Sequence, residues 1–240
     1  MPHSLFISDL HLCVEQPLTT RVFLKYVQQQ APKAEALYIL GDLFEYWAGD
    51  DDLDDPLHQQ IAHALQELSE LGTAVFIMHG NRDLLMRQKL ASACGASLLA
   101  DPTLLDLYGT PTLLTHGDLL CTDDVDYQTY RKQVHNAVWQ QQFLSQPLMQ
   151  RKAFITQLRA RSENEKKAKS SEIMDVNTDA VAEMLRKHHY PRLIHGHTHR
   201  LNLHIHIVDG HQCERWVLGD WNAMGNALRC NALGCYREHF

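Results

Sequence analysis

The strongest constraint on the fold is a recurring pattern in which an apolar run leads directly into aspartate, histidine or asparagine, in most cases beside a glycine. The clearest example is Leu193 to His199, where three imidazoles within five residues follow a short apolar stretch. Taken alone, this segment fits both a metal site and a histidine-rich surface turn, because the chain has 16 histidines. Strand ends that deliver ligands onto loops are where open α/β folds place their chemistry. The recurrence therefore favours a metal site.

Four earlier segments repeat the pattern. Each has an apolar run that leads into candidate ligands: residues 5–7 into Asp9 and His11, 36–40 into Gly41-Asp42, 74–78 into His79–Asp83, and 113–115 into His116–Asp118. Runs of this length are typical of buried strands. A glycine beside a ligand lets the backbone turn sharply and approach closely. We therefore expect five strand ends to carry polar ligands.

Helical patterns lie between these runs. One helix is expected from about Leu18 to Gln30, and another from Asn177 or Thr178 to His189. Asp55 is expected to cap a third helix with Pro56 at its first position, and Gly72 to end it. Apolar residues at helical spacing would form the core face of this third helix: Leu57, Ile61, Leu65, Leu68 and Leu71.

Several polar residues of these helices and loops are expected to be solvated, among them His58, His63, His188 and His189. The acidic stretch Asp50–Asp55 lacks the glycine and glutamate of an EF-hand, so we expect a solvated loop. Short strands at 204–208, 215–218 and 227–230 indicate an antiparallel sheet portion. Together with the alternation of strands and helices, they predict an α/β sandwich of two sheets flanked by helices.

Length and composition limit the number of domains, the class of partner, the location and the state of the cysteines. With 240 residues and 45% hydrophobic content, the chain can bury one core, so we expect a single domain over 1–240 with one insertion. A net charge of −7 argues against a nucleic-acid partner. Neither a signal peptide nor a bilayer-length apolar run is evident, which predicts a cytosolic location. The six cysteines are scattered, so we expect reduced thiols rather than a disulfide framework.

The insertion is expected at about residues 122–171, where strand patterns stop and a mixed basic and apolar helical sequence begins. An ordinary helical hairpin with a solvated charged face fits this composition. A lid that offers apolar surface to a lipid-like ligand and cations to phosphates fits it as well. Composition alone leaves both interpretations open.

The candidate ligands are all oxygen or imidazole donors: Asp9, His11, Asp42, Asn81, His116, His197 and His199. Such donors suit manganese, iron, zinc or magnesium better than a cysteine-bound structural zinc. Seven are too many for one ion, but suit a pair that shares a bridging carboxylate. Such a pair promotes in-line displacement at phosphorus. The sequence therefore predicts hydrolysis of a phosphate ester or anhydride.

In these blocks the chain resembles the calcineurin-like metallophosphoesterases: Asp9-x-His11, Gly41-Asp42, Gly80-Asn81, His116 and Gly196–His199. The resemblance implies a four-layer αββα sandwich of two mixed sheets. It also implies two ligand sets, Asp9, His11, Asp42 and His199 for one metal and Asp42, Asn81, His116 and His197 for the other, with Asp42 as the bridge. His79 and His195 are not ligands in this pattern, and we expect them to support the site.

One position departs from the general pattern, because Arg82 stands where most members of the superfamily have histidine. A guanidinium cannot act as a general acid, but it can bind phosphate oxygens with two hydrogen bonds. That suits a leaving group that is itself a phosphate and needs little protonation. A pyrophosphate substrate is therefore favoured over an alkyl ester.

A narrower resemblance is to the UDP-2,3-diacylglucosamine pyrophosphohydrolases of lipid A biosynthesis, carried by further blocks such as Gly49-Asp50-Asp51, Leu120–Asp124, Ile173–Val176 and Val217–Trp221. It implies water attack on the α-phosphorus, release of UMP and 2,3-diacylglucosamine 1-phosphate, two divalent ions, usually manganese, and peripheral contact with the cytoplasmic side of the inner membrane. It makes the lid the leading interpretation of the insertion. No obligate protein partner is expected.

The same resemblance implies a set of substrate contacts: Asn81, Arg82, Asp124, Ser162, Lys166, Lys169 and His197. Lys167 is an alternative to Lys166, because the run around both lysines is the variable part of the match. A dimetal phosphodiesterase or pyrophosphatase for a soluble nucleotide is the alternative function. A non-catalytic scaffold is disfavoured, because all seven ligands are present.

Overall fold

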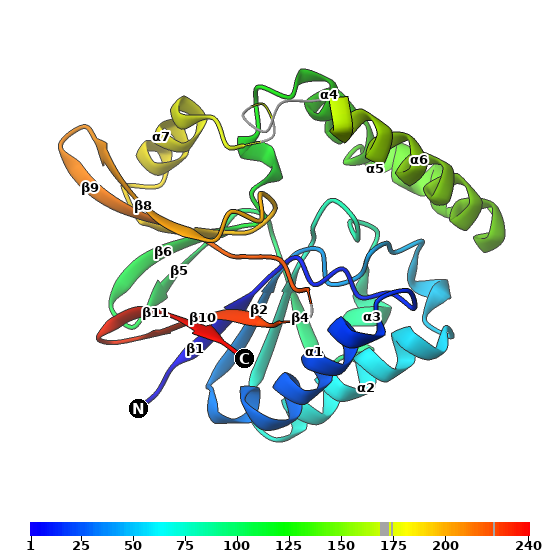
Figure 1. The fold of residues 1–240 in the computed structure, drawn as a ribbon, viewed down its shortest axis with the longest axis horizontal. Coiled ribbons are helices and arrows are strands. Elements are labelled where there is room, and N and C mark those ends of the chain that lie inside the picture. Colours follow the sequence, from blue (N-terminus) through cyan, green and yellow to red (C-terminus); the bar gives the residue numbers. More distant parts are fainter. Residues whose placement is uncertain (169–172, 174, 223) are drawn as a thin grey trace.

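The computed structural model describes residues 1–168, 173, 175–222 and 224–240, with side chains for all of these except 161–168. Among the described residues, the strands form two mixed sheets packed face to face (Figure 1). The first has the order β11 (Gly234–His239), β10 (Asn226–Asn231), β1 (Ser4–Ile7), β2 (Ala36–Leu40), β3 (Ala74–Met78), β4 (Ala96–Leu99). The second has the order β5 (Thr103–Leu107), β6 (Thr110–Thr115), β7 (Arg192–His195), β9 (His211–Val217), β8 (Asn202–Val208).

Parallel pairing sets the position of the strand ends. Strands β1, β2, β3 and β4 are mutually parallel in the first sheet, and β6, β7 and β9 are parallel in the second. The remaining pairs, β1–β10, β10–β11, β5–β6 and β8–β9, are antiparallel. Within each parallel set the carboxyl ends meet at one edge of the sheet, so the loops that carry the predicted ligands leave from the same edge.

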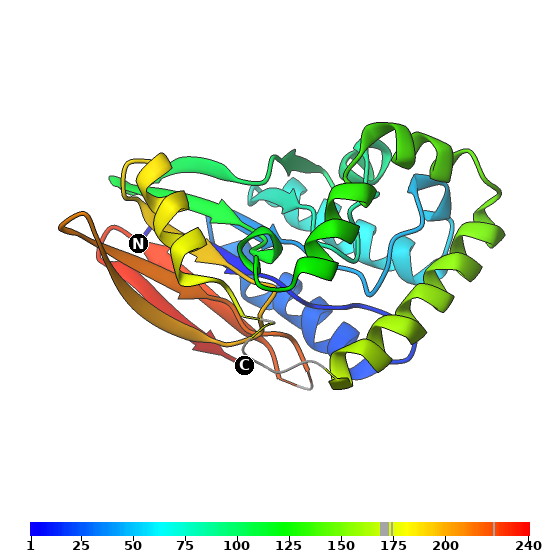
Figure 2. The same cartoon turned by 90° about the horizontal axis from the view of Figure 1, so that it is seen from above.

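Helices cover the outer face of each sheet, as Figures 1 and 2 show. Helices α1 (Pro17–Gln29), α2 (Pro56–Glu70) and α3 (Gln88–Ala93) pack on the first sheet, and α7 (Thr178–Lys187) packs on the second. Successive side chains along β1 point to opposite faces of the first sheet. Leu5 and Ile7 face the helices, whereas Phe6 belongs to the apolar cluster between the sheets. The predicted four-layer αββα sandwich is thereby confirmed.

In helix α2, the sequence pattern predicts the N-cap and most of the buried face correctly, but not the burial of two residues. Asp55 caps it by accepting a hydrogen bond from the Leu57 backbone N at 2.9 Å. Ile61 and the other mid-helix positions of the expected core face are buried, but Leu71 is 71% exposed. Leu71 follows the last helical residue as the C-cap, so it no longer faces the sheet. His58, expected to be solvated, is instead buried against the Phe44 and Trp47 rings.

The expectation of a solvated acidic loop was wrong for two of its residues. Asp50–Asp52 form a short 3₁₀ helix, and Asp52 is 3% exposed. The Asp50 carboxylate accepts hydrogen bonds from Trp47 Nε1, at 3.0 Å, and from the backbone N of Arg87 and of Leu90. These carboxylates act as internal acceptors, a role that a run of acidic residues does not indicate.

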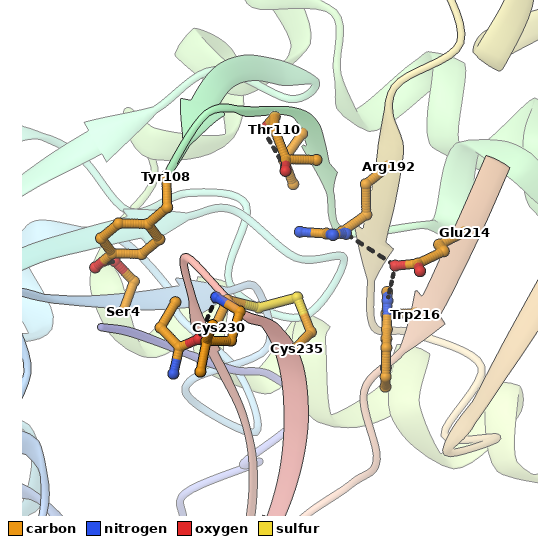
Figure 3. Close-up of a disulfide and its surroundings, with 11 residues drawn as sticks. Ser4, Tyr108, Thr110, Arg192, Glu214, Trp216, Cys230 and Cys235 are labelled. Atoms are coloured by element: carbon orange, nitrogen blue, oxygen red, sulfur yellow. Dashed lines mark hydrogen bonds and ion pairs between the residues drawn. A yellow bond between two sulfur atoms is a disulfide. The ribbon is translucent and has the colours of Figure 1, made fainter. Parts of the chain in front are cut away.

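The C-terminal hairpin corrects the expectation for the cysteines. Cys230 and Cys235 form a disulfide across β10 and β11, where they are direct cross-strand partners with Cα atoms 4.1 Å apart (Figure 3). Strand β11 was not predicted, so the facing pair was not recognised. The other four cysteines are buried free thiols, as expected.

The segment expected as an insertion contains α4 (Val125–Val134), α5 (Ala137–Leu144) and α6 (Leu148–Ala168). These helices lie to one side of the sandwich, beyond the loops at its ligand-bearing edge (Figures 1 and 2). Their role as a lid stays a prediction. Among the described residues, no helix combines the length and the apolar character needed to cross a bilayer.

We expect Ile61→Ala to lower the free energy of unfolding by about 2–5 kcal/mol, because it opens a cavity between α2 and the first sheet. Leu71→Ala on the same helix is the matched control and should change it by less than ~0.5 kcal/mol, because that side chain is exposed. Urea denaturation followed by circular dichroism measures both. Equal losses would contradict the assignment of the core face.

Candidate metal centre

The structure brings the seven predicted ligands together at the edge where both sheets end. Asp9 and His11 follow β1, Asp42 follows β2 and Asn81 follows β3, while the second sheet supplies the others, His116 after β6 and His197 and His199 after β7. The Asn81 Oδ1 atom lies 3.1 Å from His116 Nε2 and 2.9 Å from His197 Nδ1. His11 Nε2 lies 3.4 Å from His199 Nε2.

Asp42 lies between the two groups of histidines. Its Oδ2 atom is 3.9 Å from His11 Nε2 and 3.8 Å from His116 Nε2. Its other oxygen, Oδ1, accepts a hydrogen bond from the Arg82 backbone N at 2.8 Å. A carboxylate oxygen about equally distant from both histidines is in the position that a bridging ligand requires.

The backbone is strained where the ligands attach. Five of the seven ligands have positive φ: Asp9 (55°), His11 (51°), Asp42 (53°), His197 (67°) and His199 (56°). Side chains other than glycine rarely adopt this region, and it costs free energy unless the surroundings enforce it. Such outliers cluster at functional sites because they turn side chains toward a common point.

Glycines make this close approach possible. A Cβ atom on Gly80 would lie 2.1 Å from Asp42 Oδ1, and one on Gly196 would lie 2.3 Å from Asp9 Oδ2. Any larger residue at either position would displace a ligand carboxylate. The glycines of the sequence pattern therefore serve close packing against ligands, as expected.

The donors fit divalent metal ions. Asp9 Oδ1 is buried and accepts no hydrogen bond among the described residues, although it lies 3.3 Å from His199 Nε2. At this edge of the sheets, two groups have ligand atoms within 4.8 Å of one another, Asp9 with His11 and His199, and Asp9 with Asp42 and His116. Burial opposes a charged imidazole, yet Asp42 and Asp9 raise the pKa of His116 to about 9. The site therefore attracts positive charge, as a metal centre must.

Asp83 holds the Asp42 loop and was not assigned a role from sequence. It is fully buried and accepts hydrogen bonds from the backbone N of Leu43 at 2.7 Å and of Gly80 at 2.8 Å. Burial, together with the negative charge of Asp42, raises the pKa of Asp83 to about 7. The position of Asp83 directly after Gly80-Asn81-Arg82 was the one sequence signal for a role at the site. The backbone N–H groups that it binds are identified only by the three-dimensional structure.

Three further carboxylates near the predicted ligands were also missed, and two of them lie beside ligand histidines. Glu45 Oε2 lies 3.1 Å from His11 Nδ1, and Asp220 Oδ2 lies 3.7 Å from His199 Nδ1. Buried Asp118 accepts hydrogen bonds from Tyr127 and Arg131 of α4, each at 2.7 Å. Carboxylates behind metal-binding imidazoles fix ring orientation and tautomer.

The predicted substrate contacts are only partly described. Arg82 reaches Glu45, with Nη1 3.4 Å from Oε1, so its side chain borders the ligand cluster together with Asn81 and His197. Asp124 caps α4 by accepting from the Tyr127 backbone N at 3.1 Å. Lys169 and the side chains of Ser162, Lys166 and Lys167 lie outside the described residues.

The two histidines expected to support the site have other partners. His79 Nε2 donates to the Met86 carbonyl oxygen at 2.8 Å, on the segment that follows Asn81 and Arg82. His195 is fully buried, and its Nε2 accepts from Arg215 Nη1 at 3.1 Å. Both rings pack beneath the ligand loops.

We expect Asp42→Ala to bind far less divalent metal than the wild type, because it removes the carboxylate that lies between the two histidine groups. Asp209→Ala is the control, since that carboxylate pairs with Arg186 at an exposed site. Metal analysis after dialysis against manganese measures both variants. Wild-type metal content in Asp42→Ala would contradict the central place of this residue.

Comparison with known proteins agrees with this geometry. A sequence model of the calcineurin-like phosphoesterase family matches residues 3–201. Three curated relatives, each named UDP-2,3-diacylglucosamine hydrolase, match almost the whole chain. The protein of Aromatoleum aromaticum is 52% identical over 96% of this chain and 94% of the relative. The proteins of Cellvibrio japonicus and Edwardsiella ictaluri are 49% and 47% identical, each over 97% of this chain, and over 96% and 90% of their own lengths.

The family match spans all five ligand-bearing strand ends, and the structure gathers their side chains into one cluster of metal donors. The chain therefore belongs to the calcineurin-like phosphoesterase family of hydrolases.

Proposed function

We propose that this enzyme hydrolyses the pyrophosphate of UDP-2,3-diacylglucosamine during lipid A biosynthesis. Water attacks the α-phosphorus, and the products are UMP and 2,3-diacylglucosamine 1-phosphate. The observation that carries the proposal is the near full-length similarity to relatives of that name at about half identity. The position of Arg82 beside the Asp42 carboxylate agrees with it.

The proposed cofactor is a pair of Mn²⁺ ions. Asp9, His11, Asp42 and His199 would hold one ion, and Asp42, Asn81, His116 and His197 the other. When bound, the ions supply Lewis acidity that favours in-line displacement at phosphorus. The oxygen and imidazole donors of the cluster support a metal of this class over a thiolate-bound one.

Arg82 is proposed to bind the phosphate oxygens during the reaction. Its guanidinium carries a permanent charge, and Glu45 Oε1 lies 3.4 Å from its Nη1 atom. Because the departing group is a phosphate, little proton donation is needed, and charge stabilisation by the guanidinium suffices. Asn81 and His197, which contact each other at 2.9 Å, are proposed to contact substrate on the other side of Asp42.

Helices α4, α5 and α6 are proposed to form a lid over the acyl chains. Val125, Val138, Met149 and Phe154 expose apolar surface on these helices. The same segment carries the predicted contacts Asp124, Ser162, Lys166 and Lys169. The two lysines suit the phosphates, and the other two can form hydrogen bonds with the polar part of the substrate. An apolar lid surface also agrees with peripheral binding to the cytoplasmic side of the inner membrane.

We expect chelator-stripped protein to release UMP from detergent-dispersed UDP-2,3-diacylglucosamine only after manganese is added, because the metal ions supply the Lewis acidity that the displacement at phosphorus requires. Release is measured by chromatography of UMP beside a chromogenic diester. Cleavage of the diester alone would leave the metal site in place and redirect the substrate assignment to a soluble nucleotide.

We expect Arg82→Ala to lower turnover on the order of 10²-fold, the usual cost of one well-placed electrostatic group. Manganese content should stay at the wild-type level, since the hydrogen bond to Asp42 comes from the backbone N of residue 82, which the substitution keeps. Steady-state UMP release and metal analysis on the same preparation separate the two effects. Unchanged turnover would remove Arg82 from the mechanism.

A further inference from the structure

Glu45 joins three parts of the molecule through one carboxylate. Its Oε2 atom lies 3.1 Å from Nδ1 of the predicted ligand His11. Its Oε1 atom lies 3.4 Å from Arg82 Nη1, and the same oxygen pairs with Arg159 Nη2 of α6. The side chain is 13% exposed, so these contacts are largely shielded from water. A small rotation of Glu45 would therefore change its contact with His11.

The contact with His11 determines which ring nitrogen faces the metal cluster. Nδ1 lies on the side of Glu45, and Nε2 lies on the side of Asp42 Oδ2 and His199 Nε2, at 3.9 and 3.4 Å. A proton held on Nδ1 by the Glu45 carboxylate would leave the lone pair of Nε2 for the metal. A carboxylate behind a metal-binding imidazole sets this tautomer and raises the basicity of the ligand. Glu45 is thus placed to tune metal affinity without being a ligand.

In the part of α6 whose side chains the structure describes, residues 148–160, three cations contact the body of the protein. Arg151 is buried and contacts both Asp51 and the Ala48 carbonyl oxygen, and Lys152 Nζ lies 2.5 Å from Asp52 Oδ1. The third cation, Arg159, pairs with Glu45 and lies over the Tyr46 ring at 5.7 Å. Of these three attachments, the one made by Arg159 reaches a residue that contacts the ligand cluster.

We propose that Glu45 is a positioning residue that couples the docking of helix α6 to the metal centre. Arg159 holds the Glu45 carboxylate in the orientation that directs Nδ1 of His11, so the docked helix tightens metal binding. By thermodynamic linkage, bound metal tightens the docking of α6 by the same factor. The inference rests on the proposed metal centre, but not on the proposed lipid substrate.

The test is a double-mutant cycle with manganese affinity as its readout, measured by calorimetry on the chelator-stripped full chain. Glu45→Gln should weaken binding about 10-fold, the lower end of the range for residues that orient metal ligands. Arg159→Met should weaken it several-fold in the wild type and not at all in Glu45→Gln, because its effect passes through the carboxylate. Such non-additivity identifies coupled residues.

Lys152→Met is the matched control. It removes another cation from the same face of α6, but its partner is Asp52 rather than Glu45. Manganese affinity should stay at the wild-type value, although the helix loses an attachment of the same kind. Equal losses in Lys152→Met and Arg159→Met, or independent addition of Glu45→Gln and Arg159→Met, would overturn the proposal and leave only general destabilisation.

Hydrogen exchange gives the reciprocal measurement and needs no substrate. Manganese should slow amide exchange in residues 151–160 of α6 in the wild type and in Lys152→Met. In Glu45→Gln the protection by manganese should disappear, whereas protection of β1 and β2 should persist. Unaltered protection of α6 in Glu45→Gln would overturn the coupling. Failure of the enzyme to release UMP from the lipid substrate would change neither result, so the two proposals fail separately.

Discussion

The structure depends on holding two carboxylates that are buried from solvent, Asp9 and Asp42, close to four imidazoles. Charges in such an environment are tolerated only when opposite charges or hydrogen bonds compensate them. Asp9 receives hydrogen bonds from Ser8 and the His197 backbone, while Asp42 receives one from Arg82. The positive φ angles and the glycines that contact these carboxylates follow from this requirement. Divalent cations complete the compensation.

Each of the two sheets contributes part of the predicted ligand set. The first sheet delivers both aspartates on loops after adjacent parallel strands, and the second delivers His116 and the His197–His199 segment. Neither sheet carries a complete ligand set, so the packing of the sheets against each other positions the site. The apolar cluster between the sheets, which includes Phe6 and Ile194, is therefore a functional as well as a stabilising feature.

Helices α4 and α6 contact carboxylates that lie beside the predicted ligands, and α4 also contacts one predicted ligand directly. Helix α4 reaches Asp118 through Tyr127 and Arg131, and the Tyr127 ring stacks over His197 with centroids 5.8 Å apart. Helix α6 reaches Glu45 through Arg159. Movement of these helices would therefore also alter the surroundings of the metal centre.

The sequence by itself determined the strands that end in ligands, the two-sheet architecture and the seven donors, because period, glycine position and donor type are local properties. Tertiary structure alone decided that His58 and Asp52 are buried, that Leu71 is exposed and that Cys230 faces Cys235. It also decided the supporting roles of Glu45, Asp83 and Asp118. The physical reason is that each of these depends on what the folded chain places beside the side chain, and the residue type alone does not reveal whether that neighbour is an apolar group, a counter-charge, a hydrogen-bond partner or water.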